Sequence, residues 1–313
     1  MQLNQRAADL CRQLEADQQR LRINVLRKGG GTTIDLGIAA AGGLEAGLRL
    51  AEICMAGLGQ VELVPGNPAV WPGPAVAVRT DHPLAACMAS QYAGWQISVG
   101  KFFAMGSGPM RAAADTESLF DSIGHRERGE QVVGVLETRK LPSDEVFQYV
   151  AQHCGVAPDA VTLLAAPTAS QAGGVQVVAR SIETALHKLH ELGFDLRAIE
   201  SGWGVAPLPP VAADDLAAIG RTNDAILYGG EVMLWVRGDD AALAEIGAKV
   251  PSSASADHGE PFGAIFERYN RNFYDIDPHL FSPAVVTLVN LDTGRSHRFG
   301  RLLPEVIERS FTT

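Results

Sequence analysis

Cysteine is scarce in this sequence, and its scarcity argues against two kinds of cross-linked fold. The 313 residues contain four cysteines, which lie far apart and form no C-x-x-C pair: Cys11, Cys54, Cys87 and Cys154. Four scattered cysteines without a C-x-x-C pair favour neither a disulfide framework nor a zinc knuckle, so we expect reduced thiols of the kind found in the cytoplasm. Each cysteine is expected to be a small buried apolar residue and not a nucleophile.

The sequence also lacks a hydrophobic run long enough to span a membrane. Its most apolar stretch, residues 36–58, is interrupted by Glu45, Arg49 and Glu52, whereas a membrane helix needs about 20 mainly apolar residues. Residues 1–26 are polar with spaced apolar positions, which is typical of an amphipathic helix and not of a signal peptide. We therefore expect a cytoplasmic protein with no membrane partner.

Positive charge is in the minority. Lys and Arg number 26 against 36 Asp and Glu, which gives a net charge of −10. Nucleic acids and anionic membranes need basic patches, so neither is expected as the main partner, whereas a cationic small molecule is compatible with this balance. The apolar fraction of 46% and the length permit a buried core in two ordinary domains or one large domain.

Apolar spacing and turn residues predict helices and short strands in mixed order. The predicted helices cover residues 6–20, 43–56, 83–92, 111–120, 143–154 and 172–192. The predicted strands cover residues 22–26, 34–37, 61–64, 75–78, 131–137, 161–165, 225–227 and 232–236, with a hairpin formed by 285–290 and 296–299. The order shows no regular βαβ rhythm, so the predicted fold class is mixed α/β (α+β) and not a Rossmann fold.

The helix predicted over 172–192 carries the most periodic apolar pattern, and Gly193 is expected to end it. Arg180 and Glu183 lie three residues apart on this helix, one turn from each other. Helix geometry alone favours a surface ion pair; a partly buried pair would instead hold a carboxylate poised as a base. His187 follows Glu183 by four residues, but no third ligand has supporting spacing, so no metal site is predicted.

Two glycine-rich strings are candidate ligand loops. Residues 28–33 form either a plain turn or a loop whose backbone lines a cleft, since glycine permits close approach. Gly106, Ser107 and Gly108, followed by Pro109, are expected in a loop that is either a tight connection or a set of N–H groups presented to an anion or polar ring. On spacing alone, the chain would be an α/β enzyme of undefined reaction.

Unusual strings along the whole chain carry a family resemblance. They are 79–83 (RTDHP), 90–95 (SQYAGW), 103–109 (FAMGSGP), 166–168 (APT), 179–189 (ARSIETALHKL), 220–230 (GRTNDAILYGG), 250–253 (VPSS) and 281–287 (FSPAVVT). With these strings the chain resembles the methenyltetrahydromethanopterin cyclohydrolase family from one end to the other.

The resemblance implies a reaction of one-carbon metabolism, in which water adds to N5,N10-methenyl-tetrahydromethanopterin and gives the N5-formyl compound. It implies no metal and no organic cofactor beyond the pterin carrier, which is the substrate, and it implies a homotrimer. It also implies a single family unit over residues 1–313 made of two α/β lobes with a cleft between them. The lobes divide either once near residues 165–170 or with chain crossovers.

The resemblance also implies roles for individual residues. The family's catalytic Arg and Glu, three residues apart on a helix, fall on Arg180 and Glu183, with Glu183 as general base and Arg180 as the residue that orients it. The implied substrate-binding residues are Gln91, Tyr92, Gly106, Ser107, Gly108, Thr222, Asn223 and Asp224. Two alternatives stay open: a related hydrolase acting on a folate-type carrier, and a non-catalytic pterin-binding protein.

Overall fold

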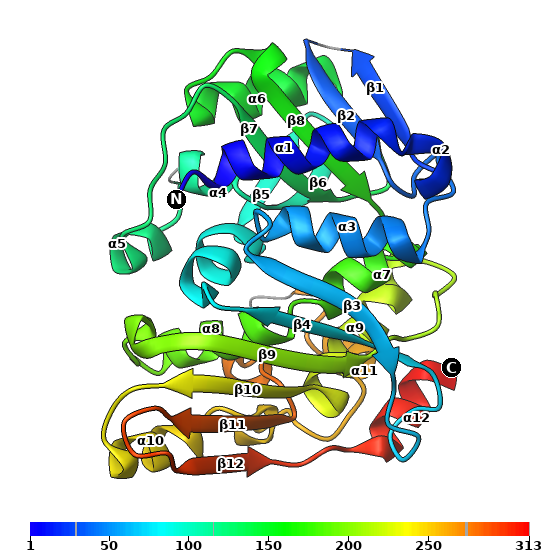
Figure 1. Cartoon of the computed structure of the whole chain (residues 1–313). Helices are drawn as coiled ribbons and strands as arrows, with labels where there is room; N and C mark the ends of the chain where they lie inside the picture. The colour runs from blue at the N-terminus through cyan, green and yellow to red at the C-terminus, as the bar shows by residue number, and fades with distance from the viewer. Residues whose placement is uncertain (29, 115, 273–274, 313) are drawn as a thin grey trace. The chain divides into compact units, whose positions relative to one another are not determined.

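The computed structural model describes the chain except residues 29, 115, 273–274 and 313. The chain forms two compact units, each built from two separate segments. Unit 1 consists of Met1–Gly59 and Ala85–Gln176, and unit 2 of Gln60–Leu84 and Val177–Thr313. The chain therefore passes from one unit to the other three times, and each unit folds around a sheet of its own (Figure 1).

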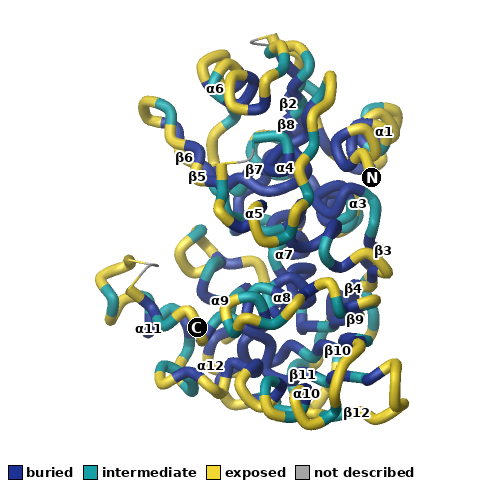
Figure 2. The backbone as a smooth tube through the Cα atoms, turned by 90° about the vertical axis from the view of Figure 1, so that its left-hand side faces the viewer, coloured by how far each residue is buried: buried dark blue, intermediate teal, exposed yellow. Residues whose placement is uncertain are grey.

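The sheet of unit 1 is mixed. Its strands are, in spatial order, β1 (Asn24–Lys28), β2 (Gly31–Asp35), β8 (Val161–Ala166), β7 (Val132–Glu137), β6 (Phe102–Ser107) and β5 (Trp95–Val99). β8 pairs in parallel with both β2 and β7, and the outer pairs are antiparallel. The central strands are covered on both faces, since neighbouring residues such as Leu163 and Leu164 belong to different hydrophobic clusters. Figure 2 shows β7 and β8 as buried.

Helices cover both faces of this sheet. They are α1 (Leu3–Ala16), α2 (Gln18–Leu21), α3 (Leu44–Cys54), α4 (Met110–Ala114), α5 (Leu119–Ile123), α6 (Asp144–Cys154) and the first part of α7 (Gln171–Val178), with the short helix η2 (Pro158–Ala160) and the π-helix η1 (Leu84–Gln91). Residues of α1 and α3 pack with Val133 and Leu164, whereas Phe147 and Val150 of α6 pack with Leu163. This alternation follows from the two-residue period of side chains along a strand.

The sheet of unit 2 is also mixed. Its strands are, in spatial order, β12 (Ser296–Gly300), β11 (Val285–Asn290), β10 (Glu231–Val236), β9 (Ile199–Pro207), β4 (Pro74–Thr80) and β3 (Gly59–Pro65). β10 and β11 are parallel, whereas β9 pairs antiparallel with β10 and β4, and β12 pairs antiparallel with β11.

The helices of unit 2 gather on one side of its sheet. They are α8 (Ser181–Glu191), α9 (Asp215–Gly229), α10 (Asp240–Gly247), α11 (Phe262–Arg268) and α12 (Pro304–Thr312), with the short helices η3 (Leu196–Ala198), η4 (Ser252–Ala254) and η6 (Pro278–Leu280). Figure 1 shows α8 to α11 behind the sheet, whose other face is turned to the viewer. In the described residues, no helix is long and apolar enough to cross a membrane.

The predicted fold class is confirmed: both units are mixed α/β, and neither sheet is a Rossmann sheet. The helices predicted over 43–56 and 143–154 are present as α3 and α6, and the hairpin predicted over 285–299 is formed by β11 and β12. Its turn contains Gly294 at φ 74°, a conformation that glycine adopts readily.

Elsewhere in the chain a predicted strand and a predicted helix are wrong. The strand expected at 225–227 lies inside α9, whose residues Ala225 to Tyr228 are all buried because α11, α12 and β9 pack around the helix. A short apolar run is ambiguous between a strand and a helix buried on several sides. The helix expected over 111–120 is interrupted, and α4 and α5 take its place.

Candidate active site

The segment predicted as one helix over 172–192 is two helices, and the break lies at the predicted catalytic arginine. Arg180 has φ −85° and ψ 8° and is the N-cap residue of α8. The apolar period continues through the break, because Val178 and Ile182 on either side are both fully buried, so the pattern does not reveal the change in backbone. Gly193, with φ 77°, follows the end of α8 as predicted.

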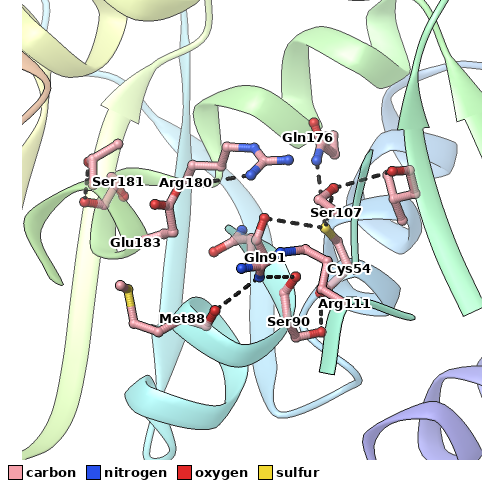
Figure 3. A network of polar contacts seen from close by, with 12 residues as sticks. Cys54, Met88, Ser90, Gln91, Ser107, Arg111, Gln176, Arg180, Ser181 and Glu183 are labelled. Atoms are coloured by element: carbon pink, nitrogen blue, oxygen red, sulfur yellow. Dashed lines mark hydrogen bonds and ion pairs between the residues drawn. The ribbon is translucent and has the colours of Figure 1, made fainter. Parts of the chain in front are cut away.

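Arg180 and Glu183 form a buried ion pair at the start of α8 (Figure 3). Arg180 Nη1 lies 3.8 Å from Glu183 Oε2, and each side chain is 6% exposed. The surface ion pair that helix geometry alone favours is therefore wrong. Glu183 lies in the first turn of α8, where the partial positive charge of a helix N-terminus favours an anion. The neighbouring guanidinium favours the anion as well.

Two glycines of β9 allow the start of α8 to lie directly on the sheet. A Cβ atom at Gly204 would lie 2.4 Å from Ser181 Oγ, and one at Gly202 would lie 2.9 Å from Ile182 Cγ2. Real Cβ contacts are longer, so a side chain at either position would push the first turn of α8 away. These glycines therefore set the height of Glu183 above the sheet, and the sequence prediction missed them.

A second polar cluster in unit 1 gathers around the thiol of Cys54. Cys54 Sγ lies 3.3 Å from Ser107 Oγ and 4.0 Å from the backbone oxygen of Gln91. Gln176 Nε2 donates to the same sulfur at 3.7 Å (Figure 3). All four residues are at most 1% exposed. The structure thus brings together two predicted substrate-binding residues, Gln91 and Ser107, through a cysteine that the sequence gave no reason to single out.

The end of the π-helix η1, which carries Gln91, is held by a buried arginine. Arg111 is fully buried, and its Nη1 donates to the backbone oxygens of Met88 and Ser90 at 2.9 and 3.3 Å. Its Nε and Nη2 donate to the carboxylate of Glu117 at 2.8 and 2.5 Å.

The same guanidinium lies 4.9 Å from the ring centre of Tyr92, a predicted substrate-binding residue. The contacts of Arg111 with Met88, Ser90 and Tyr92 hold the segment that carries Gln91 and Tyr92 in place. π-Helical turns occur often at functional sites.

The loop predicted at 106–109 begins only after Ser107. Gly106 and Ser107 are the last residues of β6, and Gly108 follows with φ 88°. The Gly108 N–H donates to the backbone oxygen of Ser90 at 2.8 Å, which ties this turn to the end of η1. The Gly108 N–H is therefore used inside the protein.

Three other predicted substrate-binding residues lie on α9. Thr222 Oγ1 and Asn223 Nδ2 donate to backbone oxygens of their own helix, at Ala218 and Ile219. Asp224 is fully buried and accepts a hydrogen bond from the Phe262 N–H at 2.7 Å, at the start of α11.

Burial raises the pKa of Asp224 to about 7, against the opposing effects of the Ser310 hydroxyl, the Phe262 N–H and Arg309. The hydrogen bonds of these three residues therefore lie within α9 or reach α11 and α12.

The glycine-rich string at 28–33 has a structural role in the described residues. β1 and β2 pair from Asn24–Asp35 to Lys28–Gly31, so the glycine-rich string at 28–33 spans a hairpin, with Gly29 outside the described residues. A Cβ at Gly31 would lie 2.3 Å from the Phe147 ring, so close packing requires glycine there.

Among the described residues, no group of three His, Cys, Asp or Glu side chains is arranged to hold a metal ion, and His187 lies 3.7 Å from Glu191.

Comparison with known proteins finds relatives along nearly the whole chain. The model of one protein family, described as cyclohydrolase (MCH), matches residues 2–311. The chain belongs to this cyclohydrolase family. A relative from Methylobacterium sp. (strain 4-46) is 49% identical, with 99% of this chain and 97% of that protein covered. A second, from Xanthobacter autotrophicus, is 50% identical, with 97% and 90% covered.

Similarity extends to Methanosarcina barkeri, whose protein is 42% identical with 99% of this chain and 98% of its own length covered. All three relatives bear the name methenyltetrahydromethanopterin cyclohydrolase.

One further polar residue of this cyclohydrolase chain escaped the sequence prediction. Lys188, on α8, is 1% exposed, and its Nζ donates to the backbone oxygen of His279 at 2.6 Å. Burial lowers the pKa of Lys188 to about 8, although the nearby Asp277 carboxylate opposes the shift. In the sequence, Lys188 stands between Leu186 and Leu189 of the apolar stripe.

Proposed function

We propose that this protein catalyses the reversible addition of water to N5,N10-methenyl-tetrahydromethanopterin, giving the N5-formyl compound. The observation that carries the proposal is the buried pair of Arg180 and Glu183 at the N-terminus of α8, in a chain of the cyclohydrolase family. The names of its relatives support the choice of substrate.

The chemistry of the substrate explains why a carboxylate suffices. The methenyl carbon lies between two nitrogens of an amidinium-like cation and is already electrophilic. The enzyme has to place a water molecule against this carbon and accept its proton. Glu183 acts as the general base, and its negative charge also attracts the cation.

Protons and bonds balance through the sequence of steps. Water oxygen bonds to the methenyl carbon while Glu183 takes one of its protons, which gives a neutral carbinol. The bond from this carbon to N10 then breaks as Glu183 returns the proton to N10. The remaining hydroxyl proton leaves to solvent as the formyl C=O forms. Positioning supplies much of the acceleration, since the reacting groups need only be held in line.

Arg180 serves this sequence by orientation. Its guanidinium lies 3.8 Å from the Glu183 carboxylate, beyond the distance of a strong hydrogen bond. It therefore stabilises the anion, while Glu183 is proposed to hold the attacking water. Gln91, Tyr92, Gly106, Ser107 and Gly108, with Thr222 to Asp224, are proposed to contribute to the binding of the pterin.

We further propose that the protein is a cytoplasmic homotrimer that needs no cofactor besides the carrier. The family resemblance supports the trimer and the absence of a cofactor. The four buried free cysteines support a reducing compartment.

The experiment that tests the function mixes the purified protein with methenyl-tetrahydromethanopterin and follows the loss of the methenyl chromophore. The expected result is decay well above the spontaneous rate, and slower decay of methenyl-tetrahydrofolate under the same conditions. Decay at the spontaneous rate with both carriers would overturn the proposal, and faster decay of the folate compound would assign the protein to a folate-type carrier.

A further inference from the structure

The side chain of Asn4, in the first turn of α1, is buried and uses both ends of its amide. Asn4 is 1% exposed. Its Nδ2 donates to the backbone oxygen of Pro109 at 3.0 Å, and its Oδ1 accepts from the Val133 N–H at 2.9 Å. One side chain thereby joins backbone groups that lie 105 and 129 positions away in the sequence.

The Asn4 amide continues a strand ladder at the point where β6 ends. Ser107 is the last residue of β6 and pairs with Val135 of β7. β7 continues past this pair, whereas the chain after Ser107 turns at Gly108, which has φ 88°. Val133 lies beyond the end of β6, and its N–H reaches the Asn4 amide. A primary amide offers the donor and the acceptor of a peptide group, so Asn4 takes the place of a strand residue.

The turn at residues 108–109 is held at both of its residues. The Pro109 oxygen accepts from the Asn4 amide at 3.0 Å and from the Ala112 N–H at 3.1 Å. A carbonyl oxygen has two lone pairs, so both bonds form together. The Gly108 N–H donates to the backbone oxygen of Ser90 at 2.8 Å. The turn is therefore tied to α1 at Pro109 and to the end of η1 at Gly108.

Asn4 is in turn anchored by the carboxylate of Glu127. The Leu3 and Asn4 N–H groups donate to Glu127 Oε2 and Oε1 at 2.7 and 3.1 Å. The first N–H groups of a helix need partners outside it, and this carboxylate provides them for α1. The Glu127 N–H donates to the backbone oxygen of Ala112 at 2.9 Å. The start of α1 lies beside α4 (Figure 1), where Leu3 and Ala112 share a hydrophobic cluster.

We propose that Asn4 is a positioning residue for the binding of the pterin, acting through the turn at Gly108. The turn follows directly on Gly106 and Ser107, which together with Gly108 are proposed to bind the pterin. The inference rests on the proposed function and adds a residue that is distant from these three in the sequence. A displaced binding turn weakens contacts made equally in the ground state and the transition state, so loss of Asn4 raises KM and leaves kcat nearly unchanged.

The test compares Asn4→Asp with Gln13→Glu in steady-state kinetics with methenyl-tetrahydromethanopterin. Asp keeps the shape of Asn and an acceptor for the Val133 N–H, but an oxygen replaces the donor that faces the Pro109 carbonyl. Gln13 is exposed on the same helix, so the control makes the same change from amide to carboxylate in solvent. The expected result is a KM about tenfold higher in Asn4→Asp with kcat within about twofold of wild type, and wild-type values in Gln13→Glu.

Glu127→Gln is a second, milder variant, because Glu127 is half-buried and Gln keeps an oxygen for one of the two N–H groups. It loosens the start of α1 without placing a charge beside the Pro109 carbonyl, and KM is expected to rise by about threefold. Thermal unfolding of each variant establishes that it is folded. An unchanged KM in the folded variants would overturn the positioning role of Asn4.

Hydrogen exchange of residues 104–112 separates this inference from the proposed function, because it needs no turnover. The expected result is faster exchange of this segment in Asn4→Asp than in wild type and Gln13→Glu. Equal exchange in all three proteins would overturn the placement of the turn by Asn4. Faster exchange in the variant, with wild-type turnover at the spontaneous rate, would overturn the proposed reaction and with it the role of Asn4 in pterin binding.

Discussion

Gly204 of β9 lies directly against Ser181, the first residue of α8, and a Cβ atom at Gly204 would come within 2.4 Å of Ser181 Oγ. This contact places the helix start, and with it Arg180 and Glu183, at a fixed height above the sheet. The catalytic carboxylate is thus positioned by the backbone of a strand as well as by its own helix.

We predict that Gly204→Ala lowers kcat by about 10²-fold, since a displacement of roughly 1 Å has this cost in a positioned site. Overpacking should also reduce the free energy of unfolding by about 1–3 kcal/mol. Ser181→Gly added to Gly204→Ala should restore much of the activity by removing the clashing hydroxyl. Gly263→Ala is the control, because a Cβ there meets no atom within 4 Å. Equal kcat in Gly204→Ala and the control would contradict the positioning role.

Arg111 should be irreplaceable by lysine. The guanidinium donates to Glu117 and to the backbone oxygen of Met88 in η1 at the same time, and an ammonium group cannot reproduce this fork. Arg111→Lys is expected to lose about 2–4 kcal/mol of unfolding free energy and to raise KM more than it lowers kcat, because Gln91 and Tyr92 lose their support. Urea denaturation and steady-state kinetics check both parts. An unchanged KM in the folded variant would limit Arg111 to a stabilising role.

Asp224 should make stability depend on pH in the acidic range. Burial raises its pKa to about 7, so between about pH 4 and 7 the folded state keeps a proton that the unfolded state has lost. The free energy of unfolding from this group therefore falls as pH rises through that window. Asp224→Asn retains an oxygen for the Phe262 N–H and should remove this fall.

The measurement for Asp224 is urea denaturation at pH 5 and pH 8, with the exposed Glu308→Gln on α12 as control. The expected result is a smaller loss of stability between the two pH values in Asp224→Asn than in wild type and control. The same pH dependence in all three proteins would contradict a buried, protonated Asp224.

Lys188 should make the unfolding free energy depend on pH in the alkaline range, with the opposite sign to Asp224. Burial lowers its pKa from 10.5 to about 8, so between these values the unfolded state holds a proton that the folded state lacks. The free energy of unfolding from this group therefore rises with pH through this window. Lys188→Met should abolish the rise, whereas Lys249→Met, at an exposed position of unit 2, should keep it. Denaturation of wild type and both variants at pH 8 and pH 10 measures this rise in unfolding free energy. An equal rise in Lys188→Met and Lys249→Met would contradict the role of Lys188.

Much of the fold could be predicted from the sequence where local signals agree. The hairpin of β11 and β12 has alternating strands and a glycine turn, and α6 has Ser143 before it and Gly155 at φ 69° after it. The break between α7 and α8 could not be predicted, because both helices bury their apolar side chains and the period continues across Arg180. The exchange of segments between units depends on contacts distant in sequence.

The candidate site, too, could be predicted only in part. The spacing of Arg180 and Glu183 is visible in the sequence, but their burial comes from packing that helix geometry alone does not reveal. The cluster around Cys54 joins residues 37 and 53 positions away, at Gln91 and Ser107. An isolated cysteine gives no sign of such neighbours, so only the fold identifies it.

The most direct test of the account compares Glu183→Gln with Glu191→Gln in the loss of the methenyl chromophore. Both residues lie on α8, and the Glu191 side chain is 43% exposed. We expect Glu183→Gln to stay folded and to lose turnover by about 10²–10⁴-fold, the contribution typical of a general base, while Glu191→Gln keeps wild-type turnover. Near-wild-type turnover in Glu183→Gln would contradict the assignment of this carboxylate as the base.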